Sequence, residues 1–149
     1  MTSIRFYHLQ TQNLDEALPA ILEKAYEQNH KIMVQMADEK EVERMTTHLW
    51  SYKEHYFLPH GSKKDGNALE QPIWITNSTN NENQANVLIL TQGTTNDAIT
   101  DFDLCCEIFD GRSHEAVQNA RKKWTEYKSK NLDVTYWHQS ETGKWDKKS

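Results

Sequence analysis

Glycine is scarce in this chain of 149 residues, which holds only five, at positions 61, 66, 93, 111 and 143. None of them lies in a GxGxxG or GxxxxGK[ST] pattern, the glycine-rich turns whose backbone amides cradle phosphate groups. The turn expected after the first strand, residues 10–13, contains no glycine at all. The sequence therefore argues against a nucleotide site of the usual type, and we expect no bound cofactor.

Cysteine and clustered metal ligands are equally sparse. The only cysteines, Cys105 and Cys106, are adjacent, and neighbours on a strand point to opposite faces, so we expect no disulfide between them. The seven histidines are scattered and form no HExxH pattern, and no GxSxG nucleophile turn is present. A nucleophilic cysteine with a distant histidine stays open, but the apolar surroundings of both thiols favour a buried structural role.

Long apolar runs are missing too. No segment approaches the roughly 20 apolar residues that span a bilayer. The first residues lack an apolar stretch and a small-residue cleavage site, so we expect no signal peptide. These features predict a reduced, cytoplasmic protein without a membrane partner.

Charge is present but unevenly distributed. The net charge is −5, yet residues 111–149 carry nine Lys/Arg against five Asp/Glu, so the rest of the chain is strongly acidic. Such a chain is a poor general binder of nucleic-acid backbone, because that affinity comes mainly from Lys and Arg. We expect DNA to be met only indirectly. The local basic patch is either a site for a small anionic partner or a solvated helix face.

Hydrophobic periodicity alternates between strand and helix along the chain. Strands are predicted at 4–9, 31–36, 72–76, 86–91, 102–109 and 132–138, and helices at 14–25, 38–50 and 113–130. Asn13, Asp38 and Ser113 are the expected N-caps, while Pro19 predicts a later start or a bend in the first helix. This order predicts a single α/β domain over residues 1–149, with a mainly parallel sheet and helices on both faces.

The last predicted helix carries the most distinctive pattern. Val117, Arg121, Trp124 and Lys128 share one stripe, and Thr125 flanks it. An aromatic ring between two cations suits a short acidic peptide that ends in an apolar residue and a free carboxylate. The alternative, that Trp124 belongs to the core and the cations are ordinary surface charges, is equally compatible with the spacing.

Several segments together resemble the chi subunit of bacterial DNA polymerase III. They are Trp50 followed by residues 57–61 (FLPHG), residues 71–76 (QPIWIT), residues 120–127 (ARKKWTEY), Tyr136-Trp137 and the final Gly143-Lys-Trp145. The resemblance implies one α/β domain with a nucleotide-binding-like layout but no phosphate loop. It also implies a non-catalytic replication subunit that acts as an adaptor within the clamp-loading machinery.

The same resemblance implies two binding surfaces. One binds the acidic tail of single-stranded-DNA-binding protein (SSB), which ends in Phe, through positions corresponding to Arg121 and Trp124. The family often has further lysines where this chain has Val117 and Thr125, and Lys122, Lys128 or the basic C-terminus are candidates to compensate.

The other surface binds the psi subunit, or an equivalent clamp-loader protein, through the position of Phe57, with Trp50, Pro59 and His60 as neighbours. We expect a monomer that links the two partners. A small nucleotide- or metal-dependent enzyme on a similar fold remains the alternative.

Overall fold

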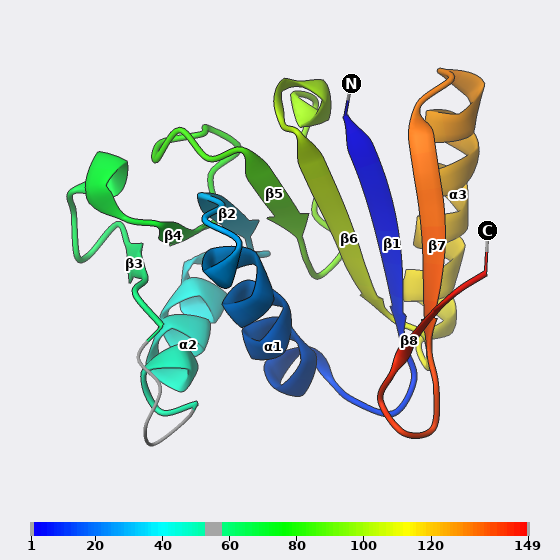
Figure 1. The fold of residues 1–149 in the computed structure, drawn as a ribbon, viewed down its shortest axis with the longest axis horizontal. Helices are drawn as coiled ribbons and strands as arrows, with labels where there is room; N and C mark the ends of the chain where they lie inside the picture. Colours follow the sequence, from blue (N-terminus) through cyan, green and yellow to red (C-terminus); the bar gives the residue numbers. More distant parts are fainter. Residues whose placement is uncertain (1, 53–57, 149) are drawn as a thin grey trace.

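One eight-stranded sheet organises the molecule, which the computed structural model describes for residues 2–52 and 58–148. The strands stand in the order β3-β4-β2-β5-β6-β1-β7-β8 and all pair in parallel except β8, which runs antiparallel to β7 (Figure 1). Their bounds are β1 Ser3–Leu9, β2 Ile32–Gln35, β3 Gly61–Ser62, β4 Ile73–Thr76, β5 Val87–Leu90, β6 Leu104–Asp110, β7 Asp133–Gln139 and β8 Trp145–Lys147. The mainly parallel α/β sheet predicted from the sequence is confirmed.

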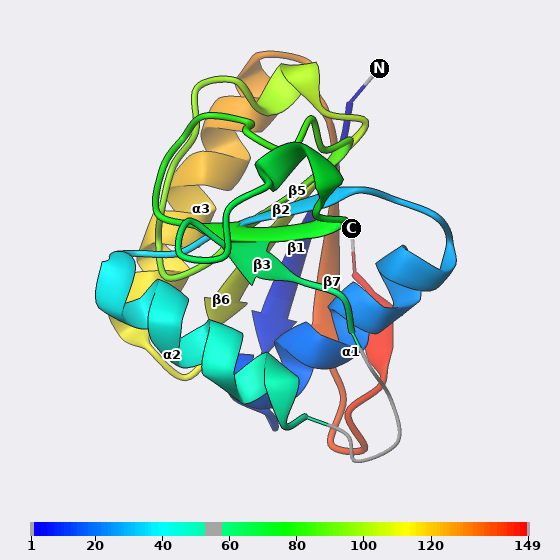
Figure 2. The ribbon, with the colours of Figure 1, turned by 90° about the vertical axis from the view of Figure 1, so that its left-hand side faces the viewer.

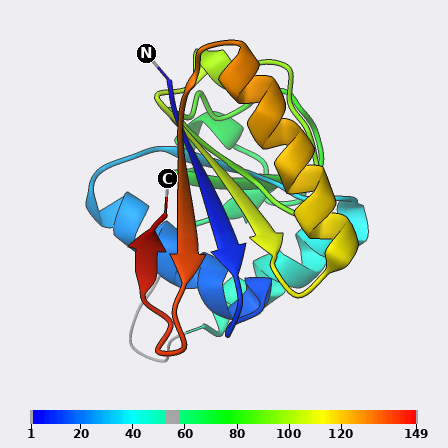
Figure 3. The same ribbon diagram turned by 90° about the vertical axis from the view of Figure 1, so that its right-hand side faces the viewer.

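Helices cover both faces of this sheet. The α-helices are α1 Leu14–Glu27, α2 Glu39–Trp50 and α3 His114–Ser129, and short 3-10 turns lie at Ala68–Glu70 and Ile99–Asp101. Figures 2 and 3 show α1 and α2 on one side of the strands and α3 on the other. In the described part of the chain, none of the helices is long and apolar enough to cross a membrane.

Two separate cores result from this arrangement. Alternate residues of β1 point to opposite faces, so Tyr7 and Leu9 belong to the core on the side of α1 and α2, while Ile4 and Phe6 pack under α3. The central strands β2 and β5 are buried throughout, as expected for parallel strands covered on both sides.

Local signals set the helix starts. Asn13 accepts a hydrogen bond from the Glu16 amide, and the Glu16 side chain accepts one from the Asn13 amide, which completes a capping box. With this cap α1 begins at Leu14, so Pro19 lies inside the helix and does not delay its start. Asp38 and Ser113 cap α2 and α3 as predicted.

Candidate functional site

Helix α3 presents one face to the sheet and another to solvent. Ala120 and Tyr127 are buried against β1 and β6, whereas Arg121, Thr125 and Lys128 are exposed. The predicted stripe thus lies along the border between the packed face and the solvent face.

Trp124 is packed against the sheet and also partly exposed. The ring is half-buried and packs edge-to-face on Phe6 and Tyr136, with centroids 5.6 and 5.9 Å away. The Lys128 ammonium lies 5.1 Å from the centroid of the Trp124 ring, within cation–π range. Trp124 therefore anchors α3 to the sheet and still presents an aromatic surface beside a cation.

A cavity of about 370 Å³ opens between α3 and the C-terminal strands. Its lining consists of Val117, Ala120, Arg121, Trp124, Tyr136 and Lys148. The lining contains two cations and no carboxylate, so the cavity favours an anionic ligand that has an apolar part. We call it the α3 cavity.

Three residues of the α3 cavity, Ala120, Tyr136 and Lys148, were not among the tail-binding residues predicted from the sequence. Tyr136 of β7 lies two residues after Val134, so both side chains point to the α3 side of the sheet. Strand periodicity could have revealed this pattern. Lys148 arrives through β8, and its amide donates to the Tyr136 carbonyl over 2.7 Å. The basic C-terminus therefore supplies a cation beside the position where Val117 stands.

The other candidate cations lie elsewhere on α3. Lys128 contacts the Trp124 ring, while Lys122 does not line the cavity. Thr125 lies outside the lining too, and its hydroxyl donates to the Arg121 carbonyl over 3.0 Å.

Behind Tyr136 lies a cluster of rings. The Tyr136 hydroxyl is hydrogen-bonded to Nδ1 of His8, whose ring centroid is 4.4 Å from that of His138 and 5.1 Å from that of Phe109. Burial, together with nearby His138, lowers the pKa of His8, and burial raises the pKa of Tyr136. Both shifts favour the neutral forms of His8 and Tyr136.

The second predicted surface centres on Trp50. Its side chain is 51% exposed, and its ring lies 4.3 Å from that of His60, which is only 4% exposed. The two ring nitrogens of His60 lie 2.6 Å from the Leu58 carbonyl oxygen and 3.0 Å from that of Thr46. His60 thus supports Trp50 from beneath, Pro59 is half-buried beside it, and Phe57 lies outside the described residues.

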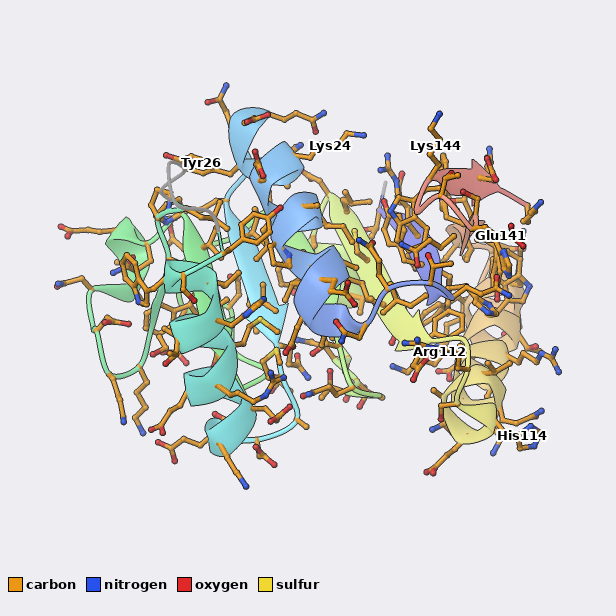
Figure 4. All side chains as sticks on the ribbon, turned by 90° about the horizontal axis from the view of Figure 1, so that it is seen from below. Lys24, Tyr26, Arg112, His114, Glu141 and Lys144 are labelled. Carbon is orange, nitrogen blue, oxygen red and sulfur yellow. The ribbon has the colours of Figure 1, made fainter. Side chains whose placement is uncertain are left out.

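A third hollow lies where nucleotides bind in many open α/β sheets. β1 continues into α1 on one face and its neighbour β6 continues into α3 on the other, which makes a crevice at their carboxyl ends. In this crevice Arg44 pairs with Asp15 and Glu41, at 2.6 and 3.0 Å. Arg112, at the start of α3 (Figure 4), pairs with Asp110 at 3.1 Å. Because carboxylates already neutralise both arginines, the crevice offers little attraction to phosphate.

No group of three or more His, Cys, Asp or Glu side chains among the described residues could hold a metal ion. The two thiols are buried, and burial raises the pKa of Cys106 to about 12 and that of Cys105 well above its usual value. Neither thiol is set up as a nucleophile, since the thiolate is the reactive form.

Comparisons with known proteins agree with one another. Residues 1–135 match the family model "DNA polymerase III chi subunit, HolC". A protein of Rickettsia prowazekii (strain Madrid E), "Probable DNA polymerase III subunit chi", is 34% identical over 94 residues. That match covers 63% of this chain and 57% of the relative, so a good part of the relative's length has no counterpart in the match.

Proposed function

Because the chain belongs to the DNA polymerase III chi subunit family, an accessory replication subunit and not a catalytic enzyme, we propose that it links SSB to the clamp loader. In this proposal the α3 cavity takes the acidic C-terminal tail of SSB, and the surface around Trp50 takes psi or an equivalent clamp-loader protein. The protein then contacts DNA only through its partners, at the replication fork in the cytoplasm.

The α3 cavity is the observation that carries the proposal. A tail that ends in Phe brings an aromatic side chain, a free carboxylate and neighbouring acidic groups. The cavity offers the edge of Trp124 and the ring of Tyr136 to the aromatic group, and Arg121 and Lys148 to the anionic groups. A guanidinium can hold a carboxylate through two parallel hydrogen bonds, which suits Arg121 as the main anchor.

The test is a fluorescence titration with a labelled peptide that carries the last residues of the SSB tail from the same organism. A control peptide lacks the final Phe. We expect saturable binding that requires the Phe and that Arg121→Ala weakens by about 1–3 kcal/mol, the range for a lost charge-assisted interaction at an interface. Because both partners are charged, the affinity should fall as salt rises.

Lys122→Ala is the matched control, since Lys122 is exposed on the same helix but does not line the cavity. Equal losses for Arg121→Ala and Lys122→Ala would show that general charge, and not the cavity, binds the tail. Failure of a folded sample to bind any tail peptide would remove the SSB part of the proposal.

A further inference from the structure

A second cavity, of about 470 Å³, lies on the opposite face of the sheet. Among the residues that the structure describes, no helix lies in front of β1 and β7 on this face, and the C-terminal segment crosses there (Figure 1). The floor comes from Tyr7 and Cys106, one wall from Ala17 and Ile21 of α1, and the other wall from Trp145 of β8. The Trp145 ring packs edge-to-face on Tyr7 at 4.9 Å, which fixes the position of the outer wall. We call this hollow the α1 cleft.

The charge in the α1 cleft is one-sided. Its lining includes Arg5 and Lys24 but no Asp or Glu, in a protein whose net charge is −5. Within the described part of the chain, no ion pair involves either cation. Lys144 stands between the lining residues Gly143 and Trp145, and Figure 4 shows it on the same side of the molecule as Lys24, with Glu141 in the same hairpin.

Of the two cations that line the α1 cleft, Arg5 says more about the ligand that would bind there. Its guanidinium is half-buried, donates to the Tyr7 hydroxyl over 3.4 Å and lies 6.0 Å from the centre of the Trp137 ring. Burial raises the pKa of Tyr7, and it raises that of Cys106 to about 12, so these neighbours remain neutral and do not balance the charge. A half-buried cation without a carboxylate partner gains more from an incoming anion than a fully hydrated one does.

The apolar lining decides which anion fits. Seven of the sixteen lining residues are aliphatic residues of α1, β5 and β6, among them Ile21, Ile89 and Leu104. Single-stranded nucleic acid needs exposed ring faces for stacking and a track of cations for its phosphates. Here Tyr7 is 9% exposed and lies against the edge of Trp145, and only two lining residues are Lys or Arg. An apolar side chain next to carboxylates matches the cleft better.

We propose that the α1 cleft is a separate docking site for a short acidic segment of a partner protein, which places an apolar side chain between α1 and Trp145 and a carboxylate on Arg5. This site goes beyond the proposed function, because it lies on the other face of the sheet from the α3 cavity and shares no lining residue with it. It does not require a chain terminus, since the cations meet side-chain carboxylates.

The test uses the full chain, labelled with ¹⁵N, and a capped peptide in which one leucine stands between pairs of aspartates. Both peptide ends are blocked, so the probe lacks the free carboxylate expected for the α3 cavity. We expect saturable shifts of the Trp145 indole signal, lost when serine replaces the leucine. Arg5→Gln and Lys24→Gln should each weaken binding about tenfold, as for a lost charge-assisted contact, while Arg121→Ala leaves it unchanged.

Lys24→Gln is included because Lys24 is exposed on α1 and its replacement leaves the core intact. A loss of binding by this variant therefore cannot be explained by misfolding. Absence of saturable binding by the folded protein would overturn the proposal, as would binding that survives both Arg5→Gln and Lys24→Gln. Tighter binding of an oligothymidylate than of the peptide, at the same Trp145 signal, would reassign the cleft to single-stranded nucleic acid. None of these outcomes bears on tail binding at the α3 cavity, which the Arg121→Ala titration tests separately.

Discussion

The carbonyl oxygen of Asp15 accepts a hydrogen bond from Nε2 of His48 over 2.7 Å. In an uninterrupted helix that carbonyl would accept from the amide four residues later, but this position in α1 is Pro19, which has no N–H. His48, in the last turn of α2, supplies the missing donor and joins the two helices at the same time. A carbonyl can only accept, so the Nε2 atom carries the proton.

Replacing His48 should therefore destabilise the fold. We expect His48→Ala to lower the free energy of unfolding by about 1–2 kcal/mol, because a polar backbone group loses its partner. Denaturant melts of His48→Ala, Pro19→Ala and the double variant would measure the coupling. An alanine at position 19 restores the helical amide, so the loss of His48 should matter less in that background. Strict additivity would contradict the proposed pairing.

Lys148 should contribute to tail affinity although it lies at the end of the chain. We expect Lys148→Ala to weaken binding of the SSB tail several-fold, with a smaller dependence on salt, because one cation of the α3 cavity is lost. Lys147→Ala is the matched control, since neighbouring residues of a strand point to opposite faces and Lys147 does not line the cavity. Similar effects of the two substitutions would argue against a specific place for Lys148.

Restoring a family cation should strengthen the site. Val117 lines the α3 cavity, so Val117→Lys adds a charge where the acidic tail is expected, and we expect severalfold tighter binding in the same titration. Thr125 is exposed and lies outside the lining, so Thr125→Lys should have less effect. The reverse order of the two gains would place the tail further along α3 than the cavity suggests.

Trp50 should matter for the clamp-loader partner. We expect Trp50→Ser to abolish capture of clamp-loader proteins from a reconstituted mixture, with little change in melting temperature because the side chain is half exposed. Leu69→Ser is the control, since Leu69 is an equally exposed large apolar residue outside the proposed surface. Retained capture by Trp50→Ser would move the partner site away from α2.

The raised pKa of Glu107 predicts that the free energy of unfolding depends on pH. Its carboxyl is buried under α3, where burial raises its pKa to about 7 even though Lys123 lies 2.7 Å away. The folded state therefore binds a proton more tightly than the unfolded state, whose glutamate has a pKa near 4.5. The resulting stabilisation is complete below about pH 4.5 and is lost as the pH rises through about 7.

The corresponding measurement compares unfolding free energies of wild type and Glu107→Gln between pH 4.5 and 8. The difference between the two proteins should change by on the order of 3 kcal/mol over that range. Groups other than Glu107 are common to both proteins, so their titration cancels in the difference. Glu82→Gln, at an exposed carboxylate, should run parallel to wild type. Parallel curves for Glu107→Gln would contradict the raised pKa.

Most of the fold could be predicted from periodicity and capping. Residues 86–91 and 102–109 are apolar enough to reveal buried strands, and Asn13, Asp38 and Ser113 mark the helix starts. β8 was not predicted, because only three residues form it and its pairing with β7 is a tertiary contact without a local signal. β3, two residues long, was missed for the same reason.

The candidate site, like the fold, could be predicted only where a local sequence pattern exists. The stripe on α3 follows from helical spacing, whereas the choice of Arg121 and Trp124 as binding residues came from the family resemblance. The basic C-terminus was a candidate too, but the place of Lys148 beside the cavity depends on a backbone hydrogen bond to Tyr136, which has no local signal. The Glu107–Lys123 pair also joins two elements, and its burial follows from packing that no local pattern records.

The short strand β8 and the residue that follows it border both hollows, with Trp145 in the wall of the α1 cleft and Lys148 in the lining of the α3 cavity. Thermodynamic linkage follows from this shared wall: a ligand that binds only when β8 is in place favours that arrangement for the other face as well. If ligand binding shifts β8, the coupling would be reciprocal, and each ligand would raise the affinity for the other by the same factor although the sheet separates them. The last few residues of the chain would then act as a common hinge between two partners that never touch.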